Sequence, residues 1–377
     1  MLRILHTADL HLGLEFGQLD GDDRRKLARA RLKVVGQILN VADQFAVDAV
    51  LWAGDIFDAP DVSADWWGGF AAALASRPGW TRPVILLPGN HDPIRSGSVF
   101  EKGHAFRAQL PPWVHVVDRD DFELAIGEHA VIYAAPCRST AGAEDLALTL
   151  PARAAGDQRI RIGLVHGSTF DLADHQTNFP IATDATTQRG LDYLAVGDTH
   201  GYREIPANAT APIVYPGAPE PTSFADAGAG DVAIVSFKRA GTRPQMHRVK
   251  VAQWTWREET VTRLAQLRSL AADDLIDTVL RLRFDLAVSA AEEKEVERLI
   301  ALLKGTSATT GRAGALVVDR RQLRAQPPSL EELGELPETL TAVAATLSAE
   351  AQASGQESDQ ARRALRLLAQ YVSEAAQ

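Results

Sequence analysis

The sequence is poor in cysteine, which excludes one class of stabilising cross-link. Cys137 is the only cysteine among 377 residues, so the chain cannot form an intrachain disulfide. There is no Cys-x-x-Cys pattern, and we expect Cys137 to be an inert buried thiol rather than a nucleophile or a metal ligand. A chain without disulfides fits the reducing conditions of the cytoplasm, which is the location we predict.

Long apolar runs are also absent from the sequence. No uninterrupted apolar stretch approaches the roughly 20 residues that a membrane-spanning helix needs. Met1 leads directly into Leu2-Arg3-Ile4-Leu5, which is too short for a signal peptide. With 46% hydrophobic and 23% charged residues, the composition is that of an ordinary globular protein. We therefore expect no membrane association and a large core with one or two smaller domains.

Positive charge is in deficit. The 39 lysine and arginine residues face 49 aspartates and glutamates, which gives a formal net charge of -10. Proteins that bind nucleic acid on their own usually carry a basic surplus, so the charge alone argues against that class. Divalent cations held by acidic ligands would offset part of this charge, and a partner subunit could supply a basic surface.

Basic residues do gather in one segment, residues 22–46, which has helical periodicity. They form either a solvated helix face, which is the usual role of such a run, or a contact to a phosphate backbone. The residues are Arg24, Arg25, Lys26, Arg29, Arg31 and Lys33.

Apolar runs of strand length alternate with helical patterns up to residue 237, which predicts an α/β fold. The predicted strands are residues 2–5, 49–53, 84–87, 160–165, 193–196, 213–218 and 232–237, with helices at 22–46 and 63–75. Three further runs, 114–117, 122–126 and 130–134, are predicted to belong to a second layer.

Five short polar motifs occur in order along the first 200 residues, and four of them directly follow an apolar run. Open α/β sheets usually place their sites where strands end and loops begin, so these motifs are expected to meet. Any one motif alone would more often be an ordinary polar turn, but five in order favour a single metal centre. The motifs are Asp9-Leu10-His11, Gly54-Asp55-Ile56-Phe57-Asp58, Gly89-Asn90-His91-Asp92, His166-Gly167 and Gly197-Asp198-Thr199-His200.

The motifs contain seven candidate metal ligands. Two divalent cations roughly 3.5–4 Å apart can clamp the attacking and leaving oxygens of a phosphoryl displacement. Such a site needs one carboxylate that bridges both ions. Mixed oxygen and imidazole ligands suit Mn²⁺, Fe²⁺ or Zn²⁺, and suit Mg²⁺ less well. The candidates are Asp9, His11, Asp55, Asn90, His166, Asp198 and His200.

The pattern changes after residue 250. The segment Trp254-Thr255-Trp256 leads into a predicted helix, and a strand at 278–284, a helix at 292–303 and a strand at 314–318 follow. These elements predict a small α+β domain. Two helices are predicted beyond it, at 330–347 and 360–372, joined by a polar linker at 354–358. The last helix carries an apolar stripe that could dock on a partner or on the chain's own core.

The five motifs together resemble the calcineurin-like metallophosphoesterase superfamily. Within it, the Asp9-Leu10-His11-Leu12-Gly13 opening, the Phe57-Asp58 pair and the Tyr215-Pro216-Gly217-Ala218 segment resemble the SbcD group of DNA repair nucleases. The resemblance implies a four-layer α/β/β/α sandwich with a small α+β capping domain and C-terminal helices. It divides the chain into a nuclease domain (1–250), a capping domain (251–325) and a helical partner-binding region (326–377).

The resemblance also implies a role for each site residue. One ion would be held by Asp9, His11, Asp55 and His200, and the other by Asp55, Asn90, His166 and Asp198, with Asp55 as the bridge. His91 would be a catalytic histidine that binds no metal. Asp58 and Asp92 would orient ligand histidines through hydrogen bonds. The cofactor would be two divalent cations, with Mn²⁺ favoured and Fe²⁺, Zn²⁺ or Mg²⁺ as alternatives.

One position departs from the family pattern. The family usually has Gly-His-x-His where this chain has Gly197-Asp198-Thr199-His200. Aspartate is a competent ligand, but it adds a negative charge and has a shorter reach. The change could alter the metal preference or the affinity of the second site, or Asp198 could point elsewhere; we expect a ligand.

The predicted function is that of a metal-dependent DNA nuclease. The resemblance implies a partnership with a coiled-coil ATPase of the SbcC type through the C-terminal helices, and a homodimer is compatible with it. A phosphatase or a cyclic-nucleotide phosphodiesterase with the same metal core is the alternative, which the acidic net charge favours slightly. A weakly active binding subunit is a third reading, against which the retention of His91 argues.

Overall fold

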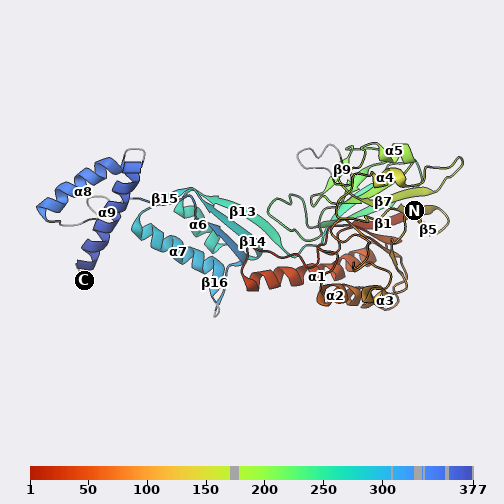
Figure 1. Ribbon diagram of the computed structural model, residues 1–377, viewed down its shortest axis with the longest axis horizontal. Helices are drawn as coiled ribbons and strands as arrows, with labels where there is room; N and C mark the ends of the chain where they lie inside the picture. The colour runs from red at the N-terminus through yellow and green to blue at the C-terminus, as the bar shows by residue number, and fades with distance from the viewer. Residues whose placement is uncertain (170–177, 307–308, 327–332, 334–335, 353–355, 376–377) are drawn as a thin grey trace. The chain divides into compact units, whose positions relative to one another are not determined.

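The chain folds into two compact units, which are described separately. The computed structural model describes residues 1–169, 178–306, 309–326, 333, 336–352 and 356–375. The first unit runs from Met1 to Trp256 and the second from Arg257 to Gln377 (Figure 1). The division into three functional parts at residues 250 and 325 stays a prediction.

The first unit contains two six-stranded sheets. The first has the order β12-β11-β1-β2-β3-β4, with β1 to β4 parallel. The second has the order β5-β6-β7-β8-β10-β9, with β6, β7, β8 and β10 parallel. The first sheet consists of β1 (Leu2–Thr7), β2 (Ala49–Ala53), β3 (Val84–Leu87), β4 (Val114–Val116), β11 (Asp231–Phe237) and β12 (Gln245–Lys250). The second consists of β5 (Phe122–Ile126), β6 (Ala130–Ala134), β7 (Ile160–His166), β8 (Tyr193–Gly197), β9 (Arg203–Ile205) and β10 (Ile213–Tyr215).

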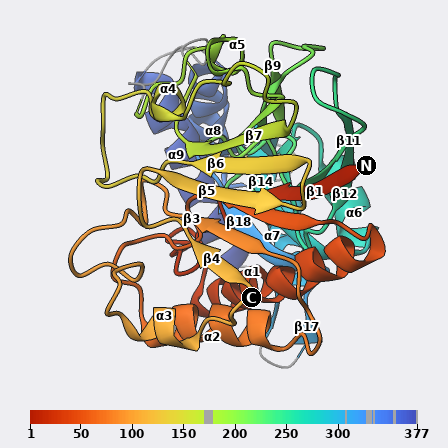
Figure 2. The same ribbon diagram turned by 90° about the vertical axis from the view of Figure 1, so that its right-hand side faces the viewer.

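Helices cover both outer faces of the paired sheets. Figure 2 shows α1, α2 and α3 beyond one sheet and α4 and α5 beyond the other. This arrangement confirms the predicted four-layer α/β/β/α sandwich. The helices are α1 (Gly21–Gln44), α2 (Ala64–Ala75), α3 (Ala105–Gln109), α4 (Leu146–Thr149) and α5 (Ala185–Arg189).

Burial on both faces explains why the central strands read as continuous apolar runs. In β2, Val50 and Trp52 belong to the core under the helices, where the Trp52 ring meets Phe70 of α2. Leu51, between them in sequence, packs in the core between the two sheets. Each large side chain buried this way stabilises the fold by about 1.5–3 kcal/mol. Because side chains pack on both faces of β2, the position of the strand is well defined, and so is the start of the loop that follows it.

One strand assignment was wrong. Residues 114–117 were predicted to belong to the second layer with 122–126 and 130–134. Instead β4 extends the first sheet, parallel to β3, whereas β5 and β6 join the second sheet. The apolar content of the segment could not decide this, because a strand of either sheet faces the shared core.

Helix α1 begins at an Asp20 cap, whose carboxylate accepts the backbone N–H of Asp23. Five residues of the basic run are exposed, as a solvated helix face predicts: Arg24, Arg25, Lys26, Arg29 and Lys33. The sixth is different. Arg31 is buried, and its guanidinium donates to the carbonyl oxygens of Leu10, Glu220 and Pro221. Arg31 therefore joins α1 to loops of the first unit, and it is not available for a phosphate contact.

The second unit contains a three-stranded sheet in the order β13-β14-β18. Side chains of α6 and α7 share one apolar core with this sheet. A helix was predicted directly after Trp256, but strand β13 intervenes. The elements are β13 (Thr255–Val261), α6 (Leu264–Ala272), β14 (Leu275–Phe284), β15 (Leu286–Val288), α7 (Ala290–Lys304), β16 (Gly305–Thr306), β17 (Thr309–Thr310), β18 (Ala313–Asp319) and β19 (Leu323–Ala325).

Two further helices, α8 (Glu338–Ala351) and α9 (Gln356–Ala375), pack on each other through a small apolar cluster that includes Ala344 and Leu365. Leu367 and Tyr371 of α9 are exposed. The predicted start of the first helix at residue 330 and the linker residues 354–355 lie outside the described residues. Among the helices that the structure describes, none is both long and apolar enough to cross a membrane.

Candidate metal centre

All five polar motifs lie at the carboxyl ends of parallel strands. The motifs of Asp9, Asp55 and Asn90 follow β1, β2 and β3 of the first sheet. His166 is the last residue of β7, and Asp198 follows β8, in the second sheet. Since the two sheets pack face to face, these loops converge, as the order of the motifs predicts.

The backbone of these loops is strained at the candidate ligands. Asp9, His11, Asp55 and Asp198 have positive φ angles of 56°, 47°, 52° and 107°. A non-glycine residue held there costs of the order of 1–3 kcal/mol and persists only where the surroundings enforce it. Four of the seven non-glycine residues with positive φ in the described part of the chain are therefore candidate ligands.

Two glycines make room for the cluster. A Cβ atom on Gly89 would collide with the carboxylate and backbone nitrogen of Asp55. A Cβ atom on Gly54, whose φ is +91°, would collide with the His166 ring. Glycine is required at both positions because the ligand side chains occupy the space of a Cβ.

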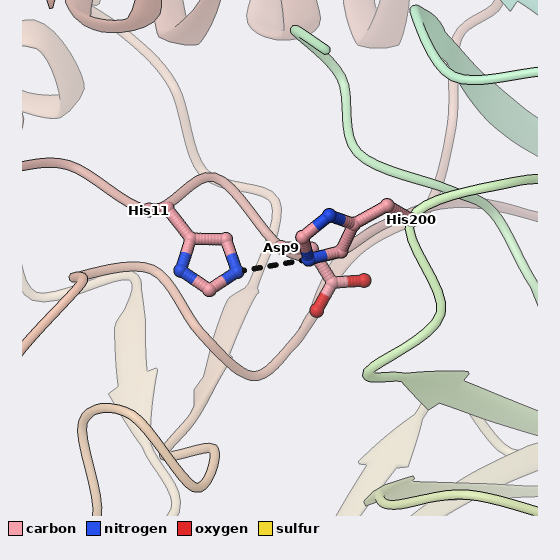
Figure 3. Close-up of side chains that lie close together, drawn as sticks. All are labelled: Asp9, His11 and His200. Carbon is pink, nitrogen blue, oxygen red and sulfur yellow. Dashed lines mark hydrogen bonds between the residues drawn. The ribbon is translucent and has the colours of Figure 1, made fainter. Parts of the chain in front are cut away.

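Asp9, His11 and His200 form the first group of donors (Figure 3). The Nε2 atoms of His11 and His200 lie 3.2 Å apart and point toward each other. Two ligands bound to one ion at about 2.1 Å lie at most about 4.2 Å from each other. The pair therefore fits a single shared cation.

The two carboxylate oxygens of Asp9 differ in their hydrogen bonding. Its Oδ1 accepts the backbone N–H of Asp198 at 2.9 Å. Its Oδ2 is buried and has no hydrogen-bond partner among the residues that the structure describes. Burial raises the pKa of Asp9. An unpaired carboxylate oxygen is costly to bury, and a cation at this place would satisfy it, so the residues present fit a metal.

Asp55 faces both halves of the cluster with one oxygen. Its Oδ2 lies 3.7 Å from His11 Nε2 and 3.4 Å from His166 Nε2. Its Oδ1 accepts the backbone N–H of His91 at 2.9 Å. Burial would raise the pKa of Asp55, but the adjacent His166 outweighs burial and lowers it below its usual range. An ionised carboxylate between two imidazoles has the position that a bridging ligand needs.

His166 leads the second group of donors. Its Nδ1 lies 2.8 Å from the carbonyl oxygen of Ala53, to which it donates, so Nε2 is directed into the site. That Nε2 lies 2.8 Å from Asn90 Oδ1. Burial opposes protonation of His166, but Asp55 and Asp9 raise its pKa well above the usual value. A divalent cation would compete with that proton.

Asp198 reaches the second group through one oxygen. Its Oδ1 lies 3.9 Å from His166 Nε2, within the limit of about 4.2 Å for two ligands of one ion. Its Oδ2 accepts a hydrogen bond from the hydroxyl of Ser168. The predicted seven ligands are thus brought together, and their roles as ligands remain a proposal.

Comparison with known proteins places this geometry in a family. The model of the calcineurin-like phosphoesterase family matches residues 2–202, which is more than half of the chain. The protein belongs to the calcineurin-like phosphoesterase family. The match covers every motif that contributes a candidate ligand.

Curated relatives of this phosphoesterase align over part of their length. A subunit of the nuclease SbcCD from Rhodobacter capsulatus is 42% identical over 99 residues, which are 25% of this chain and 22% of the relative. An uncharacterized metallophosphoesterase, YhaO, from Bacillus subtilis is 24% identical over 288 residues, which are 71% of this chain and 65% of the relative. The chain thus covers less than two thirds of each relative.

Among solved structures, the protein TT1561 of Thermus thermophilus aligns with 66% of this phosphoesterase and 99% of its own chain. The sequence identity is 11% and the TM-score is 0.42. A likeness at that level says nothing about function.

His91 of the phosphoesterase lies at the open side of the cluster. Its side chain is 46% exposed, and its ring is perpendicular to that of His11 with the centroids 4.7 Å apart. Its Nδ1 lies 3.1 Å from the backbone carbonyl of Asp58. The Asp58 carboxylate lies 3.0 Å from His11 Nδ1, the contact through which it would orient that imidazole.

The predicted role of Asp92 needs correction. Asp92 was expected to orient a histidine. Instead its two carboxylate oxygens accept the backbone N–H groups of Gly89 at 2.7 Å and Phe57 at 2.9 Å. Burial, together with the charge of Asp55, raises the pKa of Asp92 to about 7. Asp92 joins the loops after β2 and β3, and it acts on the site through their backbone.

Sequence reasoning missed three residues beside the ligands. His200 Nδ1 lies 2.9 Å from Thr222 Oγ1 and 3.3 Å from Asp226 Oδ2. Burial would raise the pKa of Asp226, but its hydrogen bonds to His200 and Thr222 outweigh burial and lower it. Ser168, which donates to Asp198, is the third. The one available signal was a threonine followed four residues later by aspartate, a common turn pattern with little specificity.

The single cysteine lies near the centre. Cys137 is buried, as predicted, and its Sγ is 3.8 Å from the carbonyl oxygen of His166. Burial raises the pKa of the thiol well above its usual value. A buried, protonated thiol of this kind is neither a good nucleophile nor a good ligand.

Proposed function

We propose that this phosphoesterase is a DNA nuclease that hydrolyses phosphodiester bonds at a two-metal centre. The position of Asp55 carries the proposal, because one of its oxygens faces imidazole nitrogens of two separate donor groups. One ion would be held by Asp9, His11, Asp55 and His200. The other would be held by Asp55, Asn90, His166 and Asp198.

The donor chemistry supports divalent transition metals. The set mixes carboxylate, amide and imidazole donors, which suits Mn²⁺, with Fe²⁺, Zn²⁺ and Mg²⁺ as alternatives. Such ions, when bound, would neutralise the charge of a phosphodiester and activate water for attack on phosphorus.

His91 is the candidate proton donor. Its Nδ1 is held at 3.1 Å from the Asp58 carbonyl, so Nδ1 carries a proton and Nε2 is left for the substrate. Its exposure gives a substrate access to the ring. In a phosphodiester hydrolysis, a protonated imidazole there would stabilise charge or give its proton to the departing oxygen.

DNA is the proposed substrate, and a coiled-coil ATPase of the SbcC type is the proposed partner. The similarity to a relative named as part of the nuclease SbcCD supports both. The exposed Leu367 and Tyr371 on α9 support docking of a partner on the C-terminal helices. A homodimer and a cytoplasmic location are compatible with this proposal.

A second candidate is a phosphatase or a cyclic-nucleotide phosphodiesterase. The net charge of -10 favours a small substrate over a long polyanion. The longer alignment is also with a metallophosphoesterase described as uncharacterized, and not with a nuclease.

The test is hydrolysis by the purified chain of linear double- and single-stranded DNA, and of small phosphoesters, with Mn²⁺ or with EDTA. We expect Mn²⁺-dependent cleavage of DNA that is lost in His91→Ala and kept in His129→Ala, which alters an exposed histidine outside the cluster. Hydrolysis of small phosphoesters without cleavage of DNA, even with the ATPase partner added, would favour the second candidate.

A further inference from the structure

Asp198 is a candidate ligand of the second donor group, and the structure shows which contacts hold it. Ser168 Oγ donates to Asp198 Oδ2, and the backbone N–H of Asp198 donates to Asp9 Oδ1 at 2.9 Å. The φ of Asp198 is 107°, a conformation that a non-glycine residue rarely adopts. These constraints fix both ends of the residue.

The constraints leave one carboxylate oxygen of Asp198 for the cluster. Because Ser168 takes Oδ2, the remaining Oδ1 is the atom that approaches His166 Nε2, at 3.9 Å. The side chain of Asp198 is 23% exposed, whereas that of His166 is fully buried. Asp198 therefore lies at the solvent side of the second donor group. The Ser168 hydroxyl, which is not itself a proposed ligand, holds it there.

The two donor groups then differ in chemistry. The first has two imidazoles and two carboxylates, from Asp9, His11, Asp55 and His200. The second has one imidazole and three oxygen donors, from His166, Asp55, Asn90 and Asp198. Oxygen donors suit harder ions such as Mn²⁺ and Mg²⁺, whereas imidazole suits Zn²⁺ and other borderline ions.

We propose that Ser168 positions Asp198 as an oxygen ligand of the second ion, and that the second site consequently prefers Zn²⁺ over Mn²⁺ less strongly than the first site does. The inference rests on the proposed two-metal centre and deepens it, since it assigns different metal preferences to its two halves. Ser168 is a positioning residue, because it acts through Asp198 and not on an ion.

The experiment measures metal binding by the full chain and does not depend on activity. Protein from which a chelator has removed all metal is titrated with Mn²⁺ and separately with Zn²⁺ by calorimetry. Bound metal is counted by mass spectrometry after dialysis. The variants are Asp198→His, Asp198→Ala and Ser168→Ala. Ser139→Ala is the matched control, since its exposed hydroxyl bonds only to the Ala141 carbonyl among the described contacts.

We expect two ions in the wild-type protein. Asp198→His should keep two ions and shift the second ion's preference toward Zn²⁺ by about tenfold or more, because an imidazole replaces an oxygen donor. Ser168→Ala should lower the affinity for the second ion by about 10–100-fold, which is the usual effect of losing a group that orients a ligand. The first ion should bind with unchanged affinity in both variants. Ser139→Ala should match the wild type.

The outcomes separate this inference from the function on which it rests. A wild-type protein that binds fewer than two ions would contradict the two-metal centre itself. Two ions in the wild type, with unchanged affinities in Asp198→Ala, would overturn the inference alone. Should Asp198→His fail to fold, as judged by its melting transition, Ser168→Ala still decides, because unchanged binding there removes the positioning role.

Discussion

The loops of the candidate metal centre and the second unit differ in how the charge of their carboxylates is balanced. In the second unit, several solvent-accessible acidic side chains pair with arginine, as Glu295 does with Arg268 at 2.8 Å and Asp285 with Arg324 at 2.8 Å. In the first unit, Asp9 and Asp55 are buried beside histidines. Exposed pairs are satisfied by each other and by water and contribute little to stability. Asp9 and Asp55 have no arginine or lysine partner among the described ion pairs, and a bound cation would balance their charge, so they mark a candidate site.

The largest expected effect is the loss of bound metal in Asp55→Ala, which removes a buried carboxylate of the first unit. The bridging position predicts the loss of both ions, a greater loss than the about 10–100-fold that removal of an outer hydrogen-bond partner costs. Bound metal would be counted by mass spectrometry. Asp285→Ala, which removes an exposed carboxylate paired with Arg324, is the control and should keep both ions. Full metal occupancy in Asp55→Ala would contradict the assignment of Asp55 as the bridging ligand.

His91→Ala should separate chemistry from metal binding. We expect both ions to remain, because His91 is not among the proposed ligands, and activity to fall by about 10²–10⁴-fold. The measurements are metal content and the rate of phosphodiester hydrolysis on the same preparation. If the ions are lost together with the activity, His91 is a ligand and the proposed division of roles is wrong.

His6 offers a third case, a buried titratable group away from the ligands. It lies 3.0 Å from the Tyr193 hydroxyl, and burial lowers its pKa to about 3. Between pH 6.5, the value for an unperturbed histidine, and about 3, the unfolded chain binds a proton that the folded chain does not. Stability should therefore fall as the pH falls through this window, by up to about 1.4 kcal/mol per pH unit from this group.

The check is denaturant unfolding of chelated protein between pH 4 and 6.5, so that metal binding does not contribute. His6→Gln should have a shallower slope of unfolding free energy against pH than the wild type, whatever its absolute stability. Equal slopes would show that His6 is not the group responsible.

The smallest effect should come from the second unit. Arg320 and Glu297 form a bidentate ion pair, in which both side chains are nearly half exposed. Arg320→Ala should change the free energy of unfolding by less than about 1 kcal/mol and leave metal content unchanged. A large loss of stability in a thermal melt would mean that the ion pairs of this unit contribute substantially to its folding, and that the two units differ less in the role of their carboxylates.

Most of the fold, and the meeting of the candidate ligands, could be predicted from the sequence, and particular residues show why. His11 and His200 are far apart along the chain, yet both follow strands whose carboxyl ends lie at one edge, so strand periodicity sufficed to predict their meeting. The sheet membership of β4 was beyond reach, because the segment is apolar enough for either sheet. Ser168, Thr222 and Asp226 were missed because their hydrogen bonds depend on loop conformation, which has no periodic signature. The backbone role of Asp92 was missed for the same reason.

The candidate ligands come from loops of both sheets, and they extend along the chain from Asp9 to His200. No shorter fragment of the chain contains the complete donor set. During synthesis, the donor set can be complete only after β8 and the residues that follow it have emerged and the second sheet has packed on the first, which joins segments far apart in the sequence. Nascent or misfolded chains would thus lack the complete donor set, so any metal-dependent hydrolysis would be confined to molecules whose folding is finished.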